Sequence, residues 1–85
     1  MPFASYEVAE ILNRARWIYL KTGGNVGAAA EFLIINFPDL TTVEIYALVR
    51  WLALPQGDVE KLTIILNSLT ADMKTADVKR IMGID

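Results

Sequence analysis

Glycine and proline divide this 85-residue chain into short segments, each about as long as one helix. The segments meet at Gly23-Gly24, at Pro38-Asp39, at Pro55-Gln56-Gly57 and within residues 70–75. Glycine readily takes the left-handed backbone conformation that ends a helix, and the residue before a proline avoids helical angles. We therefore expect several short elements, with no helix continuing through Pro38 or Pro55.

Within each segment the apolar residues recur at intervals of three and four, which is the spacing of one face of a helix. No segment alternates cleanly between apolar and polar residues beside a hairpin signal, so β structure is not expected. The expected helices run from Ser5 to about Thr22, from Val26 to about Phe37, from Thr42 to Leu54, from Val59 through Leu69, and from Thr75 to Met82, before Gly83. The sequence thus predicts one all-α domain over residues 1–85, a compact bundle of four to five short helices.

Four of the expected helix starts carry a side chain suited to capping, namely Ser5, Asn25, Thr41 and Asp58. The oxygen of such a side chain accepts a hydrogen bond from a backbone N–H that the first turn leaves free. Residues 41–44 read Thr-Thr-Val-Glu and fit a capping box, in which the Thr41 hydroxyl reaches forward and Glu44 reaches back. This pattern predicts where the third helix begins.

The apolar stripes also predict a core. Its expected members are Ala29, Leu33, Ile45, Leu48, Val49, Leu52, Leu62 and Leu66. In the second helix only Gly27, Glu31 and Asn36 fall outside the apolar set. We therefore expect the second helix to be the central one of the bundle.

The first and third helices carry apolar residues on two faces. At 100° per residue, Trp17 points away from the stripe that holds Val8 and Ala15, and Trp51 lies away from the stripe that holds Leu48. A helix that is apolar on two sides is either central in its domain or covered by another molecule.

Two interpretations of these second faces remain open. One is irregular packing that takes both tryptophans into the core, because small cores often use large aromatic residues. The other is a protein interface, since Trp, Tyr and Arg are enriched at interface hot spots. The candidate interface residues are Tyr6, Trp17, Leu20, Tyr46, Arg50 and Trp51.

Composition excludes several classes of function. Hydrophobic residues make up 54% of the chain and charged residues 21%, a balance that excludes intrinsic disorder. Cysteine and histidine are both absent, which removes thiolate nucleophiles, disulfides, the commonest general base and the commonest metal ligands. We therefore expect a non-enzymatic protein with no cofactor, no bound metal and no small-molecule substrate.

Charge bears on the partner and on the location. The net charge is −2 and no segment is strongly basic, which disfavours a nucleic-acid coat and an anionic-membrane binder. Glu31 and Arg50 interrupt the two most apolar runs, so no transmembrane span is expected. The first residues, Met-Pro-Phe-Ala-Ser-Tyr-Glu, lack the features of a signal peptide. We expect a cytoplasmic protein without a membrane partner.

Residues 19–35 read Tyr-Leu-Lys-Thr-Gly-Gly-Asn-Val-Gly-Ala-Ala-Ala-Glu-Phe-Leu-Ile-Ile. This segment resembles the helix-turn-helix of the Fis and NtrC type, in which one helix ends in Thr-Gly-Gly-Asn and the next contains Ala-Ala-Glu-x-Leu. Phage terminase small subunits open their DNA-binding segment in a similar way. The same residues also resemble the last helix of a ubiquitin-associated domain, although the Met-Gly-Phe loop of that family has no counterpart here.

The helix-turn-helix resemblance implies a helix-turn-helix-like core and an alternative function in DNA binding. Its cationic candidates are Arg14, Arg16, Lys21, Arg50, Lys79 and Arg80. The pattern departs from the family after residue 33, because the turn is long and the following helix, from Thr42, holds one basic residue, Arg50. Base reading commonly uses Arg, Lys, Asn or Gln.

The favoured hypothesis is a small helical protein that binds a macromolecular partner, as an adaptor, regulator or inhibitor of possible phage origin. Self-association as a homodimer is expected, because twofold symmetric dimers are the commonest assembly. The alternative hypothesis is a helix-turn-helix DNA-binding protein, either a transcriptional regulator or a relative of the terminase small subunits.

Overall fold

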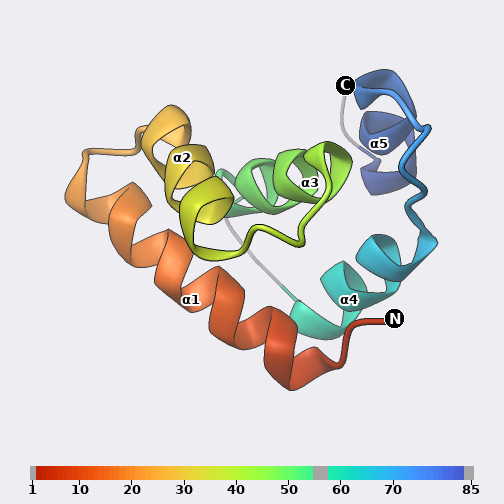
Figure 1. Ribbon diagram of the computed structural model, residues 1–85, viewed down its shortest axis with the longest axis horizontal. Helices are drawn as coiled ribbons and strands as arrows, with labels where there is room; N and C mark the ends of the chain where they lie inside the picture. The colour runs from red at the N-terminus through yellow and green to blue at the C-terminus, as the bar shows by residue number, and fades with distance from the viewer. Residues whose placement is uncertain (1, 55–57, 84–85) are drawn as a thin grey trace.

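The computed structural model describes residues 2–54 and 58–83 and contains five helices in that part of the chain (Figure 1). They are α1 (Ser5–Lys21), α2 (Val26–Asn36), α3 (Thr42–Leu52), α4 (Val59–Ser68) and α5 (Thr75–Met82). The described residues include no β-strand. The predicted all-α bundle of short helices is therefore confirmed.

The helices end close to where glycine and proline predicted. Gly23 and Gly24 follow α1 with φ angles of +71° and +86°, in the left-handed region that glycine favours. Helix α2 ends at Asn36, two residues before Pro38. Helix α3 ends at Leu52, two residues earlier than expected, while the predicted break at Pro55–Gly57 lies outside the described residues.

Three of the four predicted caps are formed. Asn25 Oδ1 accepts a hydrogen bond from Ala28 N–H at 3.1 Å, and Asp58 Oδ1 accepts one from Glu60 N–H at 3.0 Å. At α3, Thr41 Oγ1 accepts from Glu44 N–H at 3.3 Å, and Glu44 Oε1 accepts from Thr41 N–H at 2.8 Å. This reciprocal pair is the predicted capping box.

The predicted cap at Ser5 is wrong. Helix α1 already includes Ser5, and Ala4 occupies the capping position. Alanine has no side-chain acceptor, so Glu7 supplies the local hydrogen bond instead, its Oε1 accepting from Ala4 N–H at 3.0 Å. Asp77 does the same at the start of α5, where its Oδ2 accepts from Lys74 N–H at 3.0 Å.

Helix α3 is the centre of the molecule. It packs against α1, α2, α4 and α5, and Figure 1 shows it surrounded by the other four helices. Its buried residues are Val43, Ala47, Leu48, Val49, Trp51 and Leu52. Between residues 43 and 52 every side chain of α3 is buried or half-buried, so both of its apolar faces are used by the core.

The prediction that α2 is the central helix is wrong. Helix α2 packs against α1 and α3, and only Ala29 and Leu33 of its residues are fully buried. Ile34 and Ile35 are 57% and 68% exposed. A run of apolar residues therefore does not mark the central helix here, because α2 has neighbours on one side.

The rest of the predicted core is nearly complete. Of the expected members, only Ile45 is half-buried, and the others are buried. Helices α1 and α5 add further residues to the same cluster, namely Val8, Ile11, Leu12, Ala15, Val78 and Met82. One contiguous core thus joins all five helices.

A pair of hydrogen bonds ties the start of the chain to α4. Phe3 N–H donates to Asn67 Oδ1 at 2.7 Å, and Asn67 Nδ2 donates to Phe3 C=O at 3.1 Å. The residues are 64 positions apart in the sequence. This contact holds the residues before α1 against α4 and helps fix the angle at which α1 enters the bundle.

The capping box makes a stability prediction. We expect Thr41→Ala to lower the free energy of unfolding by about 1 kcal/mol, because the free N–H of Glu44 loses its acceptor. The matched control is Thr42→Ala, one residue further along at an exposed position, where alanine is the better helix former. Urea unfolding followed by circular dichroism measures both, and equal losses for the two variants would contradict the capping assignment.

Candidate protein-interaction surface

The side of α1 that faces away from the core carries three large apolar side chains. Tyr6 is 77% exposed, Trp17 is 60% exposed and Leu20 is 67% exposed. Two polar residues lie between them, and the five side chains form one stripe at alternating intervals of four and three residues. We call this stripe the outer face of α1: Tyr6, Glu10, Asn13, Trp17 and Leu20. This stripe lies opposite the buried residues of the helix.

The outer face of α1 takes no part in the core. The buried residues Val8, Ile11, Leu12 and Ala15 complete the contact of α1 with its neighbours. Lys21 Nζ lies 4.5 Å from the centroid of the Trp17 ring and covers part of one face of the indole. An exposed cation–π contact of this kind is worth about 0.5–1 kcal/mol, which leaves most of the apolar cost of exposing Trp17 in place.

The six predicted interface residues do not form one surface. Trp51 is 4% exposed and belongs to the core, so its assignment to an exposed patch is corrected. Tyr46 and Arg50 are half-buried on α3. Because α3 packs against the opposite side of α1, these three residues are separated from Tyr6, Trp17 and Leu20.

Helix α2 also carries exposed apolar residues that were not predicted from the sequence. Ile34 and Ile35 face outward with Gly27 and Glu31. The signal was present, because Gly27, Glu31 and Ile34 are spaced by four and three and Glu31 is the only charged residue of the helix. Elsewhere Ile64 on α4 and Ile81 on α5 are 68% and 40% exposed, each as a single large side chain on its helix.

The structure does not gather the predicted DNA-binding cations. Arg14, Arg16 and Lys21 lie on α1, Arg50 on α3, and Lys79 and Arg80 on α5. Figure 1 shows α1 along one edge of the molecule and α5 at the far corner beyond α3.

The local contacts of these cations are with their own neighbours. The Arg14 guanidinium lies 5.7 Å and 5.2 Å from the ring centroids of Phe32 and Phe37. Arg80 Nη1 lies 3.3 Å from Asp77 Oδ1. Arg50 Nε is buried and has no hydrogen-bond partner in the described part of the chain. The positive charge is therefore divided among three helices, α1, α3 and α5.

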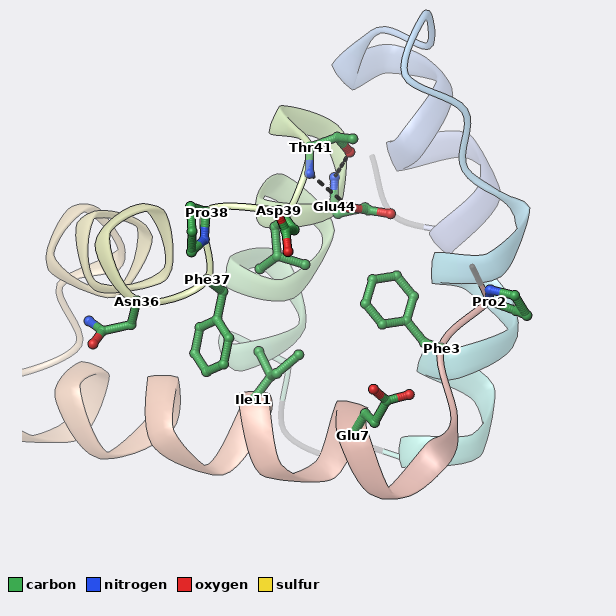
Figure 2. Close-up of a pocket in the computed structure, with 11 residues that line it drawn as sticks. Pro2, Phe3, Glu7, Ile11, Asn36, Phe37, Pro38, Asp39, Thr41 and Glu44 are labelled. Atoms are coloured by element: carbon green, nitrogen blue, oxygen red, sulfur yellow. Dashed lines mark hydrogen bonds between the residues drawn. The ribbon is translucent and has the colours of Figure 1, made fainter.

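A cavity of about 600 Å³ opens between the first half of α1 and the loop that joins α2 to α3. Figure 2 shows the side chains of Phe3, Ile11 and Phe37 converging on it. Its polar lining includes the carboxylates of Glu7 and Glu44. Both carboxylates already accept hydrogen bonds from helix-start N–H groups, so their position is explained by capping.

Groups for catalysis are sparse in the described residues. No three metal-ligating side chains come together there. The Thr70 hydroxyl donates a hydrogen bond to Asp72, and this contact holds the pKa of Asp72 below its ordinary value of 3.8. Asp72 is exposed in the loop between α4 and α5, away from the cavity. It behaves as an ionised loop residue and not as an acid or base in a pocket.

Comparison with protein-family models, with curated proteins and with solved structures gives no match to this chain. Within residues 2–54 and 58–83, no helix has both the length and the apolar content to cross a bilayer. The candidate site therefore has to be judged on its own geometry.

The two tryptophans lead to opposite stability predictions. Trp51→Ala should cost about 3–5 kcal/mol, because it opens a cavity in the core. Trp51→Phe should cost much less, since the buried Trp51 Nε1 has no hydrogen-bond partner among the described residues and its removal leaves nothing unpaired. Trp17→Ala, on the outer face, should cost no more than about 1 kcal/mol, the worth of its exposed contact with Lys21. Chemical denaturation of the dilute protein measures all three, and a Trp51→Ala variant as stable as Trp17→Ala would contradict the burial of Trp51.

Proposed function

We propose that this chain is a non-enzymatic helical protein that binds a macromolecular partner through the outer face of α1 and associates with itself. In this proposal it serves as a small adaptor, regulator or inhibitor in a cytoplasm, with a phage origin. The observation that carries the proposal is the exposure of Tyr6, Trp17 and Leu20 on one stripe of one helix.

The exposed stripe has no role in holding the fold together. The core of α1 is complete without it, and two of its three large side chains, Trp17 and Leu20, are adjacent at the end of the helix. Neighbouring exposed apolar side chains such as Trp17 and Leu20 mark interaction sites in soluble proteins, and tryptophan and tyrosine are frequent anchors in them. A partner that covers the stripe removes the cost of exposing it.

The chemistry of the chain favours binding over catalysis. Histidine and cysteine are absent, and the carboxylates Glu7 and Glu44 at the cavity are engaged in helix capping. A nucleophile paired with a base, which is the usual requirement of a hydrolytic site, is not found among the described residues. We propose no cofactor, no metal and no small-molecule substrate.

DNA binding is the alternative proposal. It is supported by the turn at Gly23-Gly24 and the cap at Asn25, which produce the expected helix, turn and helix around residues 19–35. Two observations favour protein binding over it. The six candidate cations are divided among α1, α3 and α5. Helix α3, which would follow as the reading helix, has no exposed side chain between residues 43 and 52.

The two proposals are separated by two measurements on the same protein. We expect sedimentation to show association that rises with concentration and is lost in Trp17→Ala, because the indole leaves the interface. We expect fluorescence anisotropy to show no salt-sensitive binding to mixed-sequence DNA. The matched control is Ile64→Ala, which removes an exposed side chain of α4 and should leave association unchanged.

The result that contradicts the proposal is equally plain. A wild-type chain that remains monomeric up to millimolar concentration would overturn self-association through α1. Tight, salt-sensitive binding of DNA by that monomer would favour the alternative.

A further inference from the structure

The charges of α1 are divided between its two halves. Glu7 and Glu10 are the acidic residues of the helix, and both lie in its first half. Arg14, Arg16 and Lys21 are its basic residues, and all lie in the second half. Glu7 lines the cavity, and Arg14 lies over Phe32 and Phe37. The charges beside the outer face are therefore Glu10 in the first half of α1 and Lys21, over Trp17, at its end.

The apolar residues of the outer face are also divided between the two halves of α1. Tyr6 lies at the acidic end, while Trp17 and Leu20 lie at the basic end. Asn13 is midway between Tyr6 and Leu20 along the stripe, and the charge changes sign between Glu10 and Arg14, around the same residue. The outer face is thus complementary to a copy of itself turned end to end.

From this pattern we propose that the partner of the outer face is a second copy of this chain, packed with the two α1 helices antiparallel about a twofold axis at Asn13. This inference rests on the proposed function, since it names the occupant of the same surface. A twofold contact uses the same patch on both copies and must be self-complementary. The antiparallel arrangement meets this condition, because it sets the acidic half of each helix against the basic half of the other.

The register follows from the side chains. Tyr6 of one copy lies near Leu20 of the other, and the two Asn13 amides meet at the axis, where each can donate and accept a hydrogen bond. Lys21 Nζ lies over the Trp17 ring. Its charge is therefore about one helical turn closer to the N-terminus of α1 than the Lys21 backbone, which places it opposite the region of Glu10 in the other copy. A polar residue at the centre of an apolar seam commonly fixes the register of two helices.

A parallel arrangement fails on the same charges. It would place Glu10 beside Glu10 and Lys21 beside Lys21, and like charges across an interface oppose association. The division of charge also suits the dipole of an isolated helix, which favours acidic residues early and basic residues late. The two explanations differ in the test below, since the dipole acts within one chain and the dimer requires two.

The interface is small, and this limits its strength. A helix of 17 residues spans only about 25 Å. A standard interface buries about 800 Å² on each partner, more than one helix face offers. We therefore expect a reversible dimer that forms in the micromolar range and weakens at high salt.

Charge reversal at the two ends tests the pairing. We expect Glu10→Lys alone and Lys21→Glu alone each to raise the dissociation constant about tenfold, and an equimolar mixture of the two variants to recover much of the loss. The matched controls make the same charge changes off the outer face, as Glu31→Lys on α2 and Lys61→Glu on α4, both at exposed positions. The controls should associate like the wild type.

Cysteine cross-linking tests the relative orientation of the two α1 helices. The chain has no native cysteine, so any disulfide must form at the introduced residue. In the antiparallel dimer Asn13→Cys faces its own copy and should form a disulfide on oxidation, whereas the two Lys21→Cys positions are too far apart to be bridged. In a parallel dimer both variants would cross-link.

The possible results separate this inference from the proposed function. Association that depends on Trp17 but ignores both charge reversals, or that cross-links at Lys21→Cys, overturns the antiparallel dimer and leaves the binding role of the outer face standing. A chain that never associates removes both. Charge reversals that act as expected while Asn13→Cys fails to cross-link also overturn the proposed register.

Discussion

The burial of α3 on all sides is the constraint on which the rest of this structure depends. Ala47 and Val49 lie on opposite sides of α3, and both are buried. Four helices must pack around this one helix to keep its apolar surface from water. The capping box at Thr41 and Glu44 fixes where α3 begins.

This central packing leaves one apolar side of α1 uncovered. Helix α1 packs against the core through one apolar stripe, which includes Val8 and Leu12. The apolar residues on its far side, Tyr6, Trp17 and Leu20, therefore lie outside the core. A small domain has little stability to spare, and our proposal is that a second molecule covers these residues.

Local chemistry made much of the fold predictable. The caps at Asn25, Thr41 and Asp58 and the turn at Gly23-Gly24 depend on a few neighbouring residues, and they form as expected. The identity of the central helix depends on distant contacts, which the apolar content of one segment does not reveal. For that reason α2 was expected at the centre and α3 occupies it.

The residues of the candidate site were likewise predictable where local spacing decides their exposure, and not where distant contacts decide it. Trp17 was predicted correctly as exposed, because the core stripe of α1 is complete without it. Trp51 was not, because a helix with two apolar faces can be central as well as covered by a partner. The residues of the cavity and the outward isoleucines of α2 were missed, since their positions depend on how the α2–α3 loop and α1 pack together.

The most direct test of the central claim uses the fluorescence of Trp17. The chain has two tryptophans, so Trp51→Phe leaves Trp17 as the sole tryptophan, which can be excited selectively at wavelengths that tyrosine does not absorb. It lies on the surface where a second copy is proposed to bind. We predict that its emission shifts to shorter wavelength as the protein is concentrated from micromolar to millimolar, and that added salt reverses the shift. Emission typical of a water-exposed indole at every concentration would contradict the account.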